Sequence, residues 1–298
     1  MPAPTPTPSS TQTPGPLYDN PTFYKSYHTQ APTSVTEHQT RHTEWHYMIS
    51  LVGSVVDKNV LDLGCGYGWF SKWAAEQGAR NVLGVDNSEF MLKRAGEIIS
   101  TSARTGWLEG GKVRFEVKDL DLQEEQNFKV GGDGDEGVED REDVKFDIAY
   151  SSLTFHYITH LTPLFKSISS SLSTGGKFIF SIQHPIWTAT DNGSWQTLPS
   201  TTVTPSPSTT SEKESEFEYW PVRTYSTPGP RWNRWVGDGV KIYHRPMNGY
   251  FDALRAAGFE LVDVREWVRE FGELPGGQPD SGREGHRPAW LILAARKK

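Results

Sequence analysis

The chain has little cysteine, no excess of positive charge and no long apolar run. Cys65 is the single cysteine among 298 residues, so no internal disulfide can form, which fits a reducing compartment. No apolar run approaches the ~20 residues that a membrane span requires, and the first residues lack the basic-then-apolar order of a secretion signal. These absences favour a soluble, cytoplasmic protein without a membrane partner.

Basic residues and metal-binding clusters are also scarce. The net charge is −7 and the pI is near 5.7, which disfavours a nucleic-acid partner because phosphates usually require a basic face. No cysteine or histidine cluster has metal-ligand spacing, so no metal is predicted. The hydrophobic content of 35%, with 12% aromatic residues, is enough to fill one core.

Residues 18–298 read as one domain. Three stretches, one before this domain and two within it, have compositions unlike a folded core. Residues 1–17 are rich in proline and threonine, which predicts a disordered tail. Residues 130–144 are rich in glycine and acids and predict a surface loop. Residues 200–216 are rich in serine, threonine and proline and predict a mobile loop within a larger insertion.

A glycine-rich turn follows a short apolar strand at Val60–Leu63. Gly64, Gly66 and Gly68 remove the side chains that would keep a ligand from the backbone, and a helix follows. The dinucleotide fingerprint G-x-G-x-x-G requires a third glycine where Trp69 stands. The turn therefore predicts a nucleotide-like cofactor and argues against a nucleotide-cofactor oxidoreductase, which stays an alternative.

A second apolar strand ends in an acid at Asp86. Its distance from Asp62, in the first strand, is the βαβ spacing at which a carboxylate binds ribose hydroxyls. Between the two strands, aromatic residues recur at helical spacing and Gly78 supplies a stop. Both features predict one cofactor site at the ends of the two strands.

These motifs together resemble those of class I S-adenosylmethionine-dependent methyltransferases. The resemblance implies an α/β fold, a Rossmann-like doubly wound seven-stranded sheet that ends in an antiparallel strand pair. It also implies S-adenosylmethionine as the cofactor, with the second motif holding the ribose and the third holding the adenine. The residues that it places in the cofactor site are Asp62, Gly64, Cys65, Gly66, Asp86, Asn87, Met91, Asp119, Leu120 and Ser151.

A closer resemblance is to the small-molecule, quinone-biosynthesis-like (type 11) branch of that superfamily. It rests on segments in the C-terminal half: His184–Ile186, Tyr219–Val222, Gly229–Trp235, Tyr243–Arg245 and Arg287–Leu291. The branch implies a small-molecule substrate and leaves the acceptor atom and the oligomeric state open. Similar families place a tyrosine from the N-terminal segment near the cofactor, which nominates Tyr24.

The insertion at 186–245 carries five of the eleven tryptophans. Aromatic residues at the carboxyl edge of a parallel sheet predict a lid over the substrate, because ligands bind at that edge. The alternative is that the rings form a small satellite core under a long loop. The predicted substrate-binding residues are His184, Trp187, Trp220, Trp235 and His244.

Methyl transfer from a sulfonium is an in-line displacement, in which the protein positions the acceptor and excludes water. His156, just past the fourth strand, is the predicted catalytic base, with a structural role as the alternative. The nucleobase-methylating motif Asn/Asp-Pro-Pro-Tyr/Phe is absent, since the fourth strand ends Tyr150-Ser151-Ser152-Leu153. A protein that binds S-adenosylmethionine without transferring the methyl stays a second alternative.

Overall fold

The structure is a computed structural model. It describes residues 16–42, 44–100, 106–108, 110–130, 144–190, 195–198, 217–233, 240–268, 273–274, 278–279 and 287–298. Most of the predicted tail, acidic loop and mobile loop lies outside these residues. Within the predicted tail, Leu17 already begins a short 3-10 helix.

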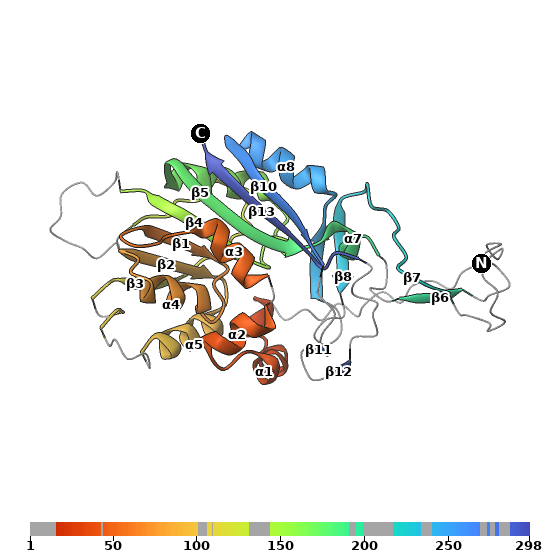
Figure 1. Cartoon of the computed structure of the whole chain (residues 1–298), viewed down its shortest axis with the longest axis horizontal. Helices are drawn as coiled ribbons and strands as arrows, with labels where there is room; N and C mark the ends of the chain where they lie inside the picture. Colours follow the sequence, from red (N-terminus) through yellow and green to blue (C-terminus); the bar gives the residue numbers. More distant parts are fainter. Residues whose placement is uncertain are drawn as a thin grey trace.

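A seven-stranded sheet forms the centre of the protein (Figure 1). Its order is β10-β13-β5-β4-β1-β2-β3; β1 to β5 run parallel, and β13 is antiparallel to both β5 and β10. The predicted Rossmann-like fold with its antiparallel pair is thus confirmed. The strands are β1 Asn59–Leu63, β2 Asn81–Asp86, β3 Val113–Val117, β4 Phe146–Ser152, β5 Leu172–Gln183, β10 Phe259–Trp267 and β13 Trp290–Lys297.

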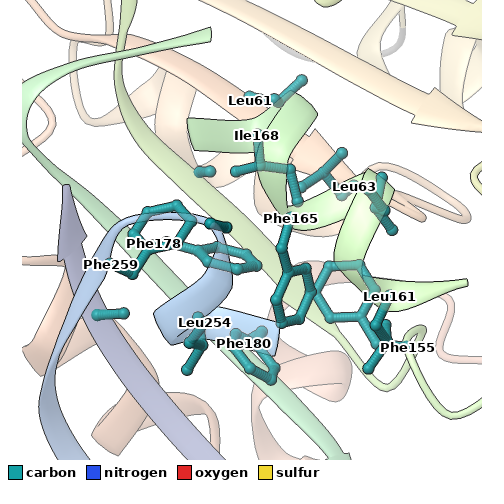
Figure 2. Packing of buried hydrophobic residues seen from close by; sticks show 14 of the residues in the cluster. Leu61, Leu63, Phe155, Leu161, Phe165, Ile168, Phe178, Phe180, Leu254 and Phe259 are labelled. Atoms are coloured by element: carbon teal, nitrogen blue, oxygen red, sulfur yellow. The ribbon is translucent and has the colours of Figure 1, made fainter. Parts of the chain in front are cut away.

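Helices cover both faces of the sheet because successive strand residues point to opposite sides. Val60 of β1 packs with residues of α3, α4 and α5, whereas Leu61 and Leu63 pack with α6 and α8. Figure 2 shows the face of the sheet that α6 and α8 cover, where Phe165 of α6 packs against Phe178 and Phe180 of β5. The helices are α3 Trp45–Val52, α4 Trp69–Glu76, α5 Glu89–Ser100, α6 Leu161–Ser171 and α8 Met247–Ala256.

The insertion is more regular than the sequence predicts. Two antiparallel strand pairs, β6–β7 and β8–β9, follow a short helix, and in Figure 1 β6 and β7 extend away from the sheet. In β9, Val240, Ile242 and His244 alternate as buried residues, so one face of this pair is packed. The elements are α7 Pro185–Thr188, β6 Gln196–Leu198, β7 Phe217–Tyr219, β8 Gly229–Asn233 and β9 Val240–His244. A further short pair joins β11 Glu273–Leu274 to β12 Gln278–Pro279.

Three short N-terminal elements precede α3. They are η1 Leu17–Asp19, α1 Pro21–Gln30 and α2 Val35–Arg41. The segment η1 contacts α5, and α2 contacts α4, so this region lies beside the helices that follow the first two strands (Figure 1). Within the ranges described above, none of the helices is long and apolar enough to cross a bilayer.

Candidate functional site

The glycine-rich turn between β1 and α4 has the backbone shape that its glycines allow. Gly64, Gly66 and Gly68 have φ angles of +67°, +53° and +71°, in a region that other residues rarely adopt. A Cβ on Gly64 would lie 2.2 Å from the Thr154 hydroxyl oxygen, so that glycine is required by packing. A Cβ on Gly66 would meet nothing within 4 Å. The space over Gly66 is therefore open to a ligand.

Asp86, at the end of β2, faces this turn. Its Oδ2 accepts a hydrogen bond from the Gly66 amide at 2.9 Å, and its Oδ1 accepts from the Ser88 amide at 3.0 Å. Burial raises the pKa of Asp86, and the amides of Ser88 and Gly66 oppose that shift. A carboxylate has about four acceptor positions, so Asp86 retains capacity for ribose hydroxyls.

Asp62 is buried and turned toward α4. Its Oδ2 accepts from the Ser71 amide at 3.1 Å and from the Ser71 hydroxyl at 2.7 Å. Burial raises the pKa of Asp62 to about 7. The carboxyl group thus anchors the first turns of α4 to β1, while its predicted contact with the cofactor stays a prediction.

The other predicted cofactor residues surround the same sheet edge. Ser151 donates to the Leu63 carbonyl at 2.8 Å, which ties β4 to the end of β1. Asp119 accepts from the Asp121 amide at 2.9 Å in a turn after β3, and Leu120 is buried beside it. Cys65 is half-buried, Asn87 is exposed and Met91 is buried in α5. Their contacts with the cofactor stay predictions.

Tyrosines from the N-terminal segment and from the loop after β4 meet beside this site. Tyr18 and Tyr157 place their hydroxyl oxygens 3.4 Å apart, and burial raises the pKa of both phenols. The predicted Tyr24 packs edge-on against Tyr67 and Phe90, with ring centroids 6.5 and 5.3 Å away. Sequence reasoning missed Tyr18 and Tyr157, although Tyr157 directly follows the predicted base.

His156 lies in a packed position rather than at an open surface. Its side chain is 1% exposed, and its Nδ1 accepts from the Gln183 amide at 3.4 Å. Its backbone oxygen accepts from the Tyr243 amide at 2.7 Å. Burial lowers the pKa of His156 to about 3. A neutral, weakly basic and enclosed imidazole supports the structural alternative better than the role of general base.

The two other predicted histidines hold the insertion in place. His184 accepts from the Ile186 amide through Nδ1 at 3.1 Å, so its Nε2 donates to Glu266, 3.0 Å away. His244 donates from Nε2 to the Tyr225 carbonyl at 2.8 Å, while its Nδ1 lies 2.6 Å from the Thr188 hydroxyl. Burial lowers the pKa of both histidines. Each imidazole already uses both nitrogens within the protein.

The predicted tryptophans surround an arginine that the sequence did not single out for chemistry. The guanidinium carbon of Arg287 lies 3.7 Å from the Trp187 ring centre, 3.9 Å from that of Trp220 and 5.6 Å from that of Trp195. Arg287 is only 4% exposed, and Trp220 also donates to the Ile186 carbonyl. This arrangement supports the satellite-core alternative. Trp235 lies outside the described residues.

A recess of about 520 Å³ adjoins this cluster. Tyr219, Trp220 and Arg223 line it, and it belongs to the insertion rather than to the glycine turn. In Figure 1, β6 and β7 stand well apart from β1 and β2. Among the residues that the structure describes, no group of three histidine, cysteine or acidic side chains is arranged to hold a metal ion.

The strand order, the open glycine turn and the acid at the end of β2 define a class I S-adenosylmethionine-dependent methyltransferase. The chain belongs to the methyltransferase domain family, whose family model matches residues 40–264. S-adenosylmethionine is the cofactor and methyl transfer is the activity. The oxidoreductase alternative is not favoured. The class is confirmed, while the quinone-biosynthesis-like branch stays a prediction.

The chain is similar to individual proteins over most of their length. An uncharacterized protein of Haemophilus influenzae is 28% identical over 292 residues, covering 94% of this chain and 96% of its own length. The S-adenosylmethionine-dependent methyltransferase of Mesorhizobium loti is also 28% identical and superposes with a TM-score of 0.60, covering 85% of this chain and 97% of its own. Magnesium protoporphyrin IX methyltransferase from Synechocystis, with bound S-adenosylmethionine, covers 94% of both chains at 17% identity and a TM-score of 0.51.

The residues present fit this cofactor. Gly66 leaves space for close approach of a ligand, and Asp86 offers acceptors to a ribose.

Proposed function

We propose that the chain methylates a small molecule at the carboxyl ends of β1 and β4, between the glycine turn and the loop after β4. The observation that carries the proposal is the pair formed by Gly66 and Asp86, because it combines open space with a ribose acceptor. S-adenosylmethionine supplies a methyl group on a positively charged sulfur. The chain's own residues bind the cofactor, orient the acceptor and exclude water.

Within this proposal, Asp86 binds the ribose, and Asp119 with Leu120 borders the adenine. Tyr18 and Tyr157, whose hydroxyl oxygens lie 3.4 Å apart, form the wall that faces the acceptor. Both phenols are protonated near neutral pH, because burial raises the pKa of each further above its usual value. Neutral phenols donate hydrogen bonds and do not accept a proton. They therefore orient an acceptor rather than deprotonate it.

The acceptor that suits this site is a group whose reacting atom already carries an unprotonated lone pair when it binds. The predicted base His156 and the predicted substrate-binding residues His184 and His244 are buried, and burial lowers the pKa of each. A nucleophile that is unprotonated near neutral pH, or that loses its proton to solvent, requires no protein base. The net charge of −7 supports a small molecule over a nucleic acid.

The fold accommodates very different acceptors. The Synechocystis relative acts on magnesium protoporphyrin IX, and a glycopeptide N-methyltransferase with bound S-adenosylmethionine superposes with a TM-score of 0.50 at 13% identity. At these identities only the fold is shared. The acceptor must therefore be identified from this chain's own product.

The lid role of the aromatic insertion and a cytoplasmic location are parts of the same proposal. The position of the insertion, directly after β5, supports contact of some of its residues with the acceptor. The single cysteine supports a reducing compartment. A fluorescent fusion observed in cells would test the location.

The experiment is methyl transfer from methyl-labelled S-adenosylmethionine into a cell extract, followed by separation by size. We expect label in the small-molecule fraction with the wild-type protein and far less with Asp86→Ala. Label in protein or nucleic acid would contradict a small-molecule acceptor. Binding of S-adenosylhomocysteine without any labelled product would favour the binding-only alternative, and thermal stabilisation by NAD alone would contradict the whole assignment.

A further inference from the structure

Asp19, in η1, binds the first turn of α5 across a large sequence distance. Its Oδ1 accepts from the Ser88 hydroxyl at 2.5 Å and from the Phe90 amide at 3.2 Å, and its Oδ2 accepts from the Glu89 amide at 3.3 Å. The first amides of a helix have no partner within the helix and favour a negative group. The Asp19 carboxylate satisfies two of these amides in α5.

Ser88 links this carboxylate to the ribose acid. Its amide donates to Asp86, while its hydroxyl donates to Asp19 and accepts from the Met91 amide at 3.1 Å. Ser88 is fully buried, so these contacts leave it one orientation. The turn between β2 and α5 is therefore fixed from the N-terminal segment as well as from the sheet.

The same segment, Leu17–Gln30, also contacts two other walls of the cofactor site. Tyr18 lies 3.4 Å from the Tyr157 hydroxyl in the loop after β4. His28 places its Nδ1 2.9 Å from the Tyr67 hydroxyl in the glycine turn. Of these three contacts, the one made by Asp19 involves a carboxylate, and Ser88 connects it to Asp86.

We propose that Asp19 is a positioning residue for the cofactor: it holds Ser88, and through Ser88 it orients Asp86 toward the ribose while docking the N-terminal segment beside the site. The inference rests on the cofactor site argued above and goes beyond it, because Asp19 acts through its contacts with Ser88 and the first amides of α5. A second consequence is electrostatic. Burial raises the pKa of Asp86, and the nearby charge of Asp19 adds to that shift.

The test compares Asp19→Ala, Asp19→Asn and a matched control, Glu37→Ala. Glu37 also accepts from backbone and hydroxyl groups of the N-terminal region, but its donor in these bonds is Thr33 rather than Ser88. Calorimetry gives the Kd for S-adenosylhomocysteine between pH 5 and 8. Hydrogen exchange of residues 17–30 without ligand reports docking of the segment.

Asp19→Ala should weaken binding about 5-fold to 10-fold, the loss typical of a removed helix cap, and should speed exchange in residues 17–30. Asp19→Asn retains a capping oxygen, so its Kd at pH 7.5 should stay within about 2-fold of wild type. Burial is the main cause of the raised Asp86 pKa, and Asp19→Asn removes a charge that adds to this shift, so binding should persist to lower pH than in wild type. If Asp19 only stabilised the fold, the pH at which binding is lost would not change.

Wild-type affinity in Asp19→Ala, an equal loss in Glu37→Ala, or an unshifted pH limb in Asp19→Asn would overturn the inference. If Asp19→Ala does not fold, Asp19→Asn and its pH profile decide the matter alone. Failure of the wild-type protein to bind S-adenosylhomocysteine would refute the cofactor site itself and the inference with it. A failure confined to the variants concerns Asp19 only.

Discussion

The region around the glycine turn, called the cofactor half below, and the aromatic insertion at 186–245 use their polar groups differently. Around the glycine turn, Gly66 leaves open space and Asp86 keeps acceptor capacity after bonding two amides. In the insertion, His184 and His244 use both ring nitrogens inside the protein, and Arg287 is enclosed by three indole rings. The first region is built to receive a ligand, whereas the described part of the second is built to hold itself together.

The largest expected effect concerns Asp86. Asp86→Ala should weaken the Kd for S-adenosylhomocysteine about 100-fold, since hydrogen bonds to a charged group contribute about 1.5–3 kcal/mol. The measurement is calorimetry, with Asp252→Ala as the control because Asp252 is exposed on α8 and pairs with Arg255. If both variants bound S-adenosylhomocysteine equally well, Asp86 would not belong to the cofactor site.

Arg287 tests the insertion in the opposite way. Arg287→Ala should lower the free energy of unfolding by about 2 kcal/mol, because a desolvated cation between aromatic rings contributes about that much. The affinity for S-adenosylhomocysteine should stay within about 2-fold of wild type. Denaturant unfolding and calorimetry measure the two quantities. A large loss of affinity would show that the tryptophan cluster belongs to the cofactor site.

Gly66 sharpens the comparison within the turn itself. Gly66→Ala should weaken the binding of S-adenosylhomocysteine about 10-fold, because the methyl group fills the open space. Backbone strain should lower the free energy of unfolding by only about 1 kcal/mol. Gly258→Ala is the matched control, since Gly258 also has a positive φ and open surroundings but follows α8. We expect similar stabilities and different affinities. Similar affinities would mean that no ligand approaches Gly66.

A further expected effect is a pH dependence of stability that comes from Asp62. Burial raises the pKa of its carboxyl from an ordinary 3.8 to about 7, so the proton binds more tightly in the folded state. This contribution to stability is present below about pH 4 and is lost as the pH rises through about 7. The wild-type protein should therefore lose about 2–3 kcal/mol relative to Asp62→Asn between pH 5 and pH 8. A constant difference in denaturant unfolding would contradict the buried, protonatable carboxyl.

The cofactor half was predictable because its signals are local. Val60 to Gly68 and the strand that ends at Asp86 place apolar residues, glycines and acids at fixed spacings within one βαβ unit. The structure differs where contacts join distant residues. Asp19 and Ser88 are 69 positions apart, and Tyr18 and Tyr157 are 139 positions apart. No spacing rule connects such pairs.

The histidines illustrate a second limit. Residue type and position nominated His156 as a base, but its chemistry depends on burial, which comes from packing against β5 and β9. The satellite core was foreseen as an alternative, yet its centre, Arg287, was not, because a cation enclosed by tryptophans leaves no periodic pattern. The hairpins of the insertion were missed since each strand has only three to five residues.

A crystal structure with S-adenosylhomocysteine tests the central claim most directly, namely that the ligand lies over Gly66 with its ribose on Asp86. We expect a ribose oxygen within about 3 Å of the Asp86 carboxylate and no ligand between Trp187 and Trp220. Ligand density in the recess beside Trp220, with the space over Gly66 vacant, would contradict the account.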